Sequence, residues 1–193
     1  MSADLGLVEI FGAEAIGQPG QRRFRLFARS RRGSAIMWME KDQLHHLSLI
    51  VDRFLAQLTE GQMLRTEAQA GGLSTPVTTM PTDFPHSPDY DFQVAELRIN
   101  YEERRALFKL VAVPLEIIME PEPQARMRED GAISFFFTQP QAQAMTSTIA
   151  VIVPAGRPVC PLCGTPLDGS PHACVRQNGH REIVPIVEED EEE

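Results

Sequence analysis

The stretch ISFFFTQPQ, residues 133–141, places the signal for a β-strand directly before the signal for a helix. Its first five residues are predominantly apolar, as is typical of a strand that belongs to a core. Thr138 then stands at the position of an N-cap, and Gln141 three residues later completes the pattern of a capping box. We therefore expect a strand that passes at once into a helix ending near Val153.

The first half of the chain repeats this order of elements. The segment IMWMEKDQ, residues 36–43, matches residues 134–141 in pattern, although hardly in identity. It leads into an expected helix over residues 41–58, in which apolar side chains recur every three or four residues. These core-facing positions are Leu44, Leu47, Val51, Phe54, Leu55 and Leu58.

Alternating apolar and polar residues predict the other strands. We predict an α+β fold in which two helices pack on one face of an antiparallel sheet. Residues 22–58 and 106–153 share the order strand, strand, helix, which favours a pseudo-duplicated unit. The alternative is coincidence, because this order of elements is common. The expected strands cover residues 5–11, 22–29, 35–39, 94–101, 106–113 and 115–119.

Two stretches are expected to be irregular. Residues 59–92 contain Gly71-Gly72 and several prolines, so we predict a long loop between the two halves of the chain. Residues 120–131 are rich in proline and charge, and we predict a second loop there.

All three cysteines lie near the C-terminal end, within a short stretch that also holds two histidines. The segment CPLCG, residues 160–164, is followed by Cys174. Close pairs of thiolate and imidazole ligands are typical of a tetrahedral zinc site. The surrounding prolines argue against the helix that a thioredoxin-type redox motif opens, and an odd number of cysteines leaves one outside any disulfide framework. We predict a structural zinc in a knuckle that resembles a zinc ribbon.

The fourth zinc ligand has two candidates beside Cys160, Cys163 and Cys174. His172 lies two residues before Cys174, so in an extended segment both side chains face the same way, and the short loop costs little entropy to close. His180 follows an Asn-Gly turn signal that could fold it back instead. We favour His172, and either choice fills all four positions with protein groups.

Length and composition indicate one core domain with an appendage. A chain of 193 residues with 42% apolar residues can bury a sizeable core. We expect a core domain over residues 1–156, a zinc-binding segment over 157–187 and a disordered acidic tail over 188–193. The tail carries six acidic residues of a chain with net charge −9. It is a solubility tail or a peptide that docks on a basic surface.

The sequence also predicts where the protein works. No apolar run reaches the roughly 18–20 residues that span a membrane. The N-terminus lacks the basic and then apolar pattern of a signal peptide, and cysteines spaced for metal suit a reducing compartment. We expect a cytoplasmic protein.

Several arginines in the strand over residues 22–29 are candidates for anion binding. With Phe24, Leu26 and Ala28 on one face, the other face presents arginines that could grip phosphate or stack on bases. They could equally form a solvated face paired with carboxylates, and the acidity of the chain favours this interpretation. The candidates are Arg22, Arg23, Arg25 and Arg29.

Local enzyme motifs are lacking in the sequence. It contains no phosphate-binding loop, dinucleotide fingerprint, zinc-protease motif or nucleophile elbow. Catalytic groups scattered along the chain remain conceivable, because such groups are recognised by geometry rather than by position. We expect a protein that is not an enzyme.

The run GRPVCPLCGTPLD, residues 156–168, followed by HACVRQNGH, residues 172–180, resembles the C-terminal signature of a mostly actinobacterial family, domain-of-unknown-function family 3090. Residues 138–142 and 6–12 are similar to it as well. The resemblance implies no established activity. It implies a gene often found beside a histidine-phosphatase-like protein and a lipid-kinase-like protein, which makes these two candidate partners. The family often carries an aromatic residue where His180 stands.

Three functions follow from these features. The first is a non-enzymatic zinc-binding protein that acts through protein–protein contacts. The second is a nucleic-acid-binding module that uses the arginine strand and the zinc knuckle. The third is a hydrolase or transferase with a pocket beneath the loop over residues 59–92.

Overall fold

The computed structural model describes residues 2–18, 20–63 and 79–155, together with Cys160, Leu162, Cys163 and Cys174. The chain divides into two compact units, Met1–Ala155 and Gly156–Glu193. The expected acidic tail lies outside the described residues. Within the described part, the first unit holds eight strands, two α-helices and one 3-10 helix. They are β1 (Ala3–Leu7), β2 (Ile10–Ile16), β3 (Arg23–Ser30), β4 (Gly33–Met39), α1 (Lys41–Met63), β5 (Tyr90–Glu102), β6 (Leu107–Glu120), β7 (Glu122–Met127), η1 (Glu129–Gly131), β8 (Ile133–Thr138) and α2 (Gln139–Ile152).

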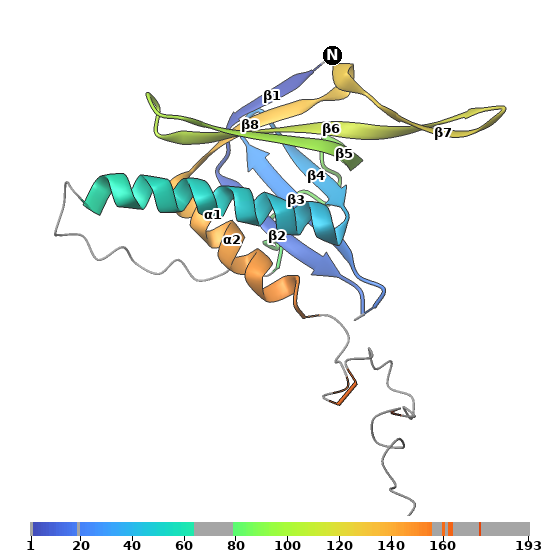
Figure 1. The fold of residues 1–193 in the computed structure, drawn as a ribbon. Coiled ribbons are helices and arrows are strands. Elements are labelled where there is room, and N and C mark those ends of the chain that lie inside the picture. The colour runs from blue at the N-terminus through green and yellow to red at the C-terminus, as the bar shows by residue number, and fades with distance from the viewer. Residues whose placement is uncertain are drawn as a thin grey trace, which may run out of the picture. The chain divides into compact units, whose positions relative to one another are not determined.

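The strands form one mixed, largely antiparallel sheet, which confirms the α+β class (Figure 1). Their order is β1-β8-β6-β5-β4-β3-β2, with β7 paired to β6 off this path. Only the pairs β1–β8 and β4–β5 are parallel among the strands described. The two strands at the ends of the order, β1 and β2, are consecutive in the chain. The short connection between them therefore joins the two ends of the order.

The connection between β1 and β2 is hydrogen-bonded to β8 and to β3, the strands next to the two ends of the order. The Val8 amide donates to the Phe136 carbonyl of β8 at 2.9 Å, and the Glu9 amide donates to the Arg29 carbonyl of β3 at 2.8 Å. One stretch of chain therefore bridges the two ends of the strand order.

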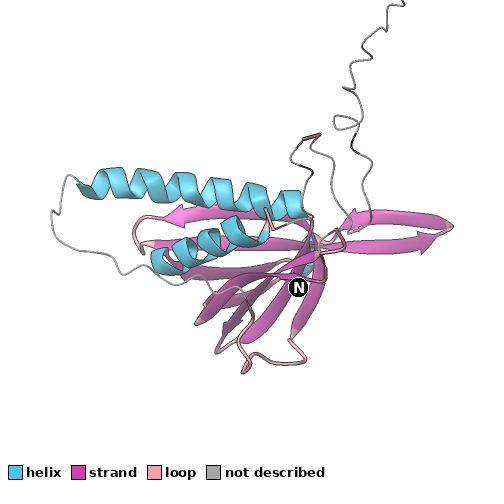
Figure 2. Ribbon diagram, turned by 90° about the horizontal axis from the view of Figure 1, so that it is seen from below, coloured by secondary structure: helices cyan, strands magenta, loops and turns pink. Residues whose placement is uncertain are grey.

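Both helices lie on the same side of the strands, as Figures 1 and 2 show. Helix α1 connects the parallel neighbours β4 and β5, and parallel strands need such a crossover. Helix α2 leaves β8 directly and packs against α1 and β2. No helix in the described part is long and apolar enough to cross a membrane.

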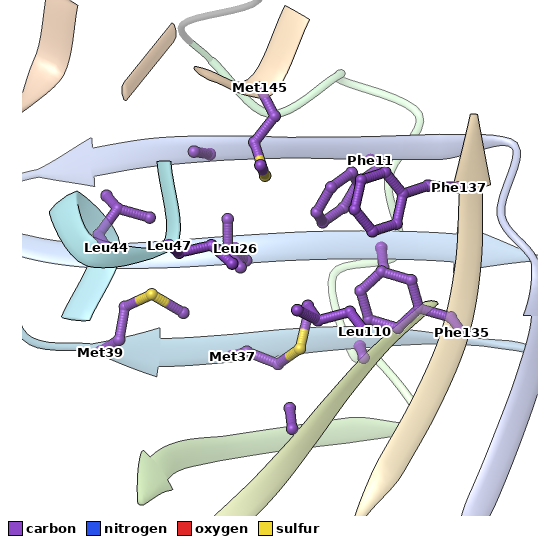
Figure 3. Packing of buried hydrophobic residues seen from close by; sticks show 14 of the residues in the cluster. Phe11, Leu26, Met37, Met39, Leu44, Leu47, Leu110, Phe135, Phe137 and Met145 are labelled. Carbon is purple, nitrogen blue, oxygen red and sulfur yellow. The ribbon is translucent and has the colours of Figure 1, made fainter. Parts of the chain in front are cut away.

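The hydrophobic core lies between the helices and the sheet, and Figure 3 shows the rings of Phe11, Phe135 and Phe137 grouped within it. Phe11 of β2 meets two rings of β8, Phe135 at 5.3 Å and Phe137 at 4.6 Å between centroids. Phe108 of β6 stacks on Phe137 at 5.3 Å. These contacts join strands from both halves of the chain, so the halves share one core.

The predicted start of α2 is confirmed in detail. The Gln141 amide donates to Thr138 Oγ1 at 3.4 Å, and the Thr138 amide donates to Gln141 Oε1 at 2.9 Å, which completes a capping box. Gln141 Nε2 also donates to the Val8 carbonyl at 3.1 Å. The cap therefore ties the helix to the connection between β1 and β2.

Both sequence-based boundaries of the irregular connection after α1 differ from the structure. Helix α1 continues to Met63 instead of ending at residue 58, and β5 begins at Tyr90 instead of residue 94, so the irregular connection is shorter than predicted. Residues 64–78 of that predicted loop lie outside the described residues. The first residues of β5 pair in parallel with β4, from Ala35↔Tyr90 to Trp38↔Gln93, and this partner is distant in the sequence.

The predicted loop over residues 120–131 is wrong in part, because it contains β7. This strand has the sequence EPQARM, which has little intrinsic strand propensity and includes a proline. Its pairing with β6 forms it. The order strand, strand, helix recurs in β3-β4-α1 and β6-β8-α2, while the pseudo-duplication stays a prediction.

The segment over residues 79–89 covers the outer face of β2, β3 and β4. Phe84 meets the Phe27 ring edge-on at 5.7 Å and forms a second cluster with Ile36. Gly12 of β2 leaves room for Phe27, because a Cβ atom there would lie 2.5 Å from the ring. Asp89 fixes the end of the segment: its Oδ2 accepts from the Ser34 amide at 2.8 Å and from Ser34 Oγ at 2.9 Å.

Replacing Phe108 by alanine tests the shared core. Phe108 is fully buried and also contacts Tyr101 and Phe54. We expect Phe108→Ala to lower the free energy of unfolding by about 3–5 kcal/mol, because it removes a large buried ring and leaves a cavity. Leu49→Ala on the exposed side of α1 is the control and should change it by less than about 0.5 kcal/mol. Urea unfolding measures both, and equal effects would contradict the shared core.

The Asp89 carboxylate should make stability depend on pH. Its pKa is lowered from 3.8 by hydrogen bonds from the Ser34 amide and hydroxyl. A lowered pKa means that the carboxylate stabilises the fold above pH 3.8 and that this contribution is lost as the pH falls below that value. We expect Asp89→Asn to lower the urea midpoint at pH 7 and to approach the wild type near pH 3. A difference that stays constant with pH would contradict this assignment.

Candidate metal centre

The three cysteines of the second unit lie together. Their Sγ atoms all lie within 4.8 Å of one another, and Cys160 Sγ and Cys174 Sγ are 3.7 Å apart. Cys160 and Cys174 are buried, and Cys163 is half-buried. The separation of Cys160 and Cys174 is well beyond the roughly 2.05 Å of a disulfide bond. The sequence therefore brings three thiols, distant by up to 14 positions, to one point.

The geometry of the cluster fits a tetrahedral metal ion. With metal–sulfur bonds of about 2.3 Å, a tetrahedral centre places two of its sulfurs about 3.8 Å apart. The Cys160–Cys174 distance of 3.7 Å matches that spacing. The three cysteines could therefore hold a metal ion without a large rearrangement of their side chains.

Both candidates for a fourth ligand, His172 and His180, lie outside the described residues. The choice between them stays a prediction. A cluster of three thiolates and one imidazole would leave no position for water or a substrate, which is the arrangement of a structural centre.

The arginine strand is β3, and its arginines point away from the core as predicted. Phe24, Leu26 and Ala28 are buried in the main cluster. On the other face, Arg25 makes two hydrogen bonds to Glu14 Oε2 of β2, at 2.9 and 2.6 Å.

Arg29 is held by the segment that returns from α1. Its guanidinium donates to the Asp83 carboxylate at 2.8 Å and to the Asp83 carbonyl at 2.6 Å. The hydrogen bond from Arg29 lowers the pKa of Asp83. Arg23 lies 4.2 Å from the ring of Trp38, whose Nε1 donates to Asp91 at 2.7 Å. The structure thus gives three of the four anion-binding candidates a partner, and Arg22 beside them is half-buried.

The sequence did not indicate Glu14, Asp83 and Trp38 as neighbours of the arginines. Glu14 could be found from its position on a preceding strand, once the register of β2 and β3 is known. Asp83 has no comparable signal, because it lies 54 positions from Arg29 in a segment without periodicity.

The sequence predicted a hydrolase or transferase pocket beneath the loop over residues 59–92. The described end of that loop is the segment over residues 79–89. A hollow below Pro81 is lined mainly by apolar side chains, with Glu9 as its single ionisable group among the described residues. Glu9 is paired with Arg31 at 3.2 Å. The hollow does not bring together the pair of titratable groups that general acid–base catalysis needs.

The fold and the cysteine cluster together describe an α+β protein with a candidate metal centre in its C-terminal unit. The chain belongs to the family described as "Protein of unknown function (DUF3090)", which matches residues 4–174. The match covers the first unit from residue 4 onward and ends at the third cysteine, Cys174. No curated protein and no solved structure matches the chain.

Proposed function

We propose that this chain is a zinc-binding protein in which zinc has a structural role. The observation that carries the proposal is the convergence of three cysteine sulfurs within 4.8 Å. Cys160, Cys163 and Cys174 supply three thiolates, and His172 supplies the fourth ligand. Zinc favours such a tetrahedral set of sulfur and nitrogen ligands and has no redox chemistry of its own.

The zinc would stabilise a segment that is too short to fold around an apolar core. Segments of this size commonly depend on a metal or on disulfides for a defined structure. In this proposal the ion closes a zinc-ribbon-like knuckle over residues 157–187, followed by the acidic tail over residues 188–193. Cysteines that bind zinc must stay reduced, which supports a location in the cytoplasm.

The protein would act by binding other proteins and not by catalysis. With His172 as the fourth ligand, the metal centre would be closed by protein groups and would offer no site for a substrate at the ion. Candidate partners are the histidine-phosphatase-like and lipid-kinase-like proteins that the family resemblance implies.

Metal analysis of the full chain, purified without added metal, tests the zinc proposal. We expect one zinc per chain in the wild type, and its loss in Cys160→Ser and in His172→Ala. His180→Ala and Leu162→Ala, a change at an exposed position between two ligands, should retain it. Wild-type protein without zinc would overturn the proposal, and retention in His172→Ala with loss in His180→Ala would move the fourth ligand to His180.

Nucleic-acid binding is the alternative function, and it has less support. Arg25 and Arg29 already pair with carboxylates, so binding phosphate there would first have to break these ion pairs. The acidic tail could also compete with nucleic acid for this surface.

Deletion of Glu188–Glu193 separates the two functions. We expect fluorescence anisotropy with a labelled single-stranded oligonucleotide to show negligible binding with or without the tail. A gain in affinity on deletion, with a steep decrease as salt is raised, would favour the nucleic-acid module. Loss of that gain in Arg22→Ala and Arg23→Ala would then locate the binding at the start of β3.

A further inference from the structure

A hollow of about 570 Å³ lies where β1, the turn between β3 and β4, and β8 come together. Phe135 and Phe137 of β8 belong to the core, so Phe136 between them faces the other side of the sheet and lines this hollow. The volume is in the range of sites that bind small molecules. We call it the β1 hollow. Its charged lining residues are Arg31, Arg32, Arg105, Asp4 and Glu9.

The backbone of β1 is irregular where it borders the β1 hollow. The register between β1 and β8 shifts between Asp4 and Leu7. Gly6 within this shift has a φ of +68°, a left-handed conformation that favours glycine. Irregular pairing of this kind redirects side chains and is common beside functional sites. Leu7, which follows the shift, is left 50% exposed at the hollow.

Arg32 is positioned by this irregular part of β1. A Cβ atom added to Gly6 would lie 3.5 Å from Arg32 Cζ, so the guanidinium lies against the Gly6 backbone. Arg32 Nη1 donates to Asp4 Oδ2 at 3.4 Å. Asp4 Oδ1 accepts from the Gly6 amide at 3.1 Å and from Ser134 Oγ at 3.3 Å. The Asp4 carboxylate is therefore held from β1 and β8, and it orients Arg32.

Arg105 reaches the β1 hollow from the turn between β5 and β6. Its Cζ lies 4.2 Å from the centroid of the Phe136 ring, and Lys109 Nζ lies 5.4 Å from the same centroid. Glu102 pairs with Arg105 at 3.6 Å. Attraction between a cation and the face of an aromatic ring fixes Arg105 beside the hollow.

The arginines of the β1 hollow keep most of their hydrogen-bond donors, because a guanidinium has five N–H groups. Within the described part of the chain, Arg31 donates only from Nε, to Glu9 at 3.2 Å, and Arg32 donates only from Nη1. Both ion pairs are exposed, and exposed pairs contribute little to stability. Arg25 and Arg29 of β3 differ, since each makes two hydrogen bonds of 2.6–2.9 Å. An anion can therefore replace the partners of Arg31 and Arg32 at a smaller cost.

The β1 hollow has a surplus of positive charge in a chain whose net charge is −9. Three arginines line it against two carboxylates, and Lys109 and Glu102 beside them balance each other. A long polyanion would also face the acidic remainder of the surface. A small anion interacts mainly with the nearest cations, because salt screens more distant charges. The charge distribution therefore favours a small anionic ligand over nucleic acid.

We propose that the β1 hollow binds a small molecule that carries phosphate groups, with Arg31, Arg32 and Arg105 as the residues that hold them. Arginine binds phosphate through two parallel N–H···O hydrogen bonds. The oxygens of a phosphate point in several directions, which suits guanidiniums from separate segments of the chain, whereas the two oxygens of a carboxylate lie in one plane. Leu7 offers an apolar contact to the rest of the molecule. The site uses the first unit alone, so it does not depend on the proposed zinc.

Isothermal titration calorimetry of the full chain at low salt, with inorganic pyrophosphate as the probe, tests this site. We expect saturable binding of one pyrophosphate per chain. Arg32→Gln and Arg105→Gln should each weaken binding by about tenfold or more, because each removes charge-assisted hydrogen bonds to the phosphates. Leu7→Glu retains every arginine but places a carboxylate in the hollow, and it should weaken binding as well.

Arg104→Gln and Arg53→Gln are the matched controls. Each lowers the net charge by the same amount as the other variants, at an exposed arginine that does not line the hollow. Both should bind pyrophosphate as the wild type does, and circular dichroism should show that all five variants are folded. Citrate, a carboxylate probe, should bind more weakly than pyrophosphate. Wild type without saturable binding, equal losses in the controls and the hollow variants, or citrate that binds as tightly as pyrophosphate would overturn the proposal.

Discussion

Residues 3–16 form both end strands of the sheet order, β1 and β2, and the rest of the first unit depends on this constraint. Strand β1 pairs with β8, and β2 pairs with β3, while the short connection between them is bonded to both. The arrangement brings Phe11 against the rings of β8 and positions the capping Gln141 next to Val8. Because the connection is short, neither end of the sheet can move away from the other without breaking the core.

Local signals in the sequence were sufficient for the elements that depend on local chemistry. The capping box at Thr138 and Gln141 and the apolar stripe of α1 both correspond to what the structure contains. Strand β7 was missed because its six residues carry little strand propensity and depend on β6 for their pairing. The extension of β5 to Tyr90 likewise depends on a distant partner, because β4 is more than fifty positions away. Parallel pairing and strand order have no counterpart in local periodicity.

The two candidate sites differ in how much of their chemistry is visible in the sequence. The cysteines are rare, they are clustered, and their spacing alone predicts that they meet, which agrees with the convergence of their sulfurs. The arginine strand is equally conspicuous, but whether its arginines are available to bind an anion depends on residues elsewhere in the chain. Glu14 and Asp83 compensate Arg25 and Arg29 from 11 and 54 positions away. The function of a run of charged residues therefore cannot be inferred until the residues that pair with them are known. The ligands of a metal site, in contrast, can be recognised from their own spacing.

The parallel pairing of β1 with β8 also affects how the protein is made. Ser134 Oγ donates to Asp4 Oδ1 across 130 positions of sequence, so β1 pairs with a strand that is synthesised long after it. Until β8 emerges, residues 3–7 have no neighbour on that side. Contacts between such distant segments slow folding and prolong the exposure of strand edges. The hairpins β2-β3-β4 and β5-β6 can form during synthesis, but closure of the core waits until β8 has been made.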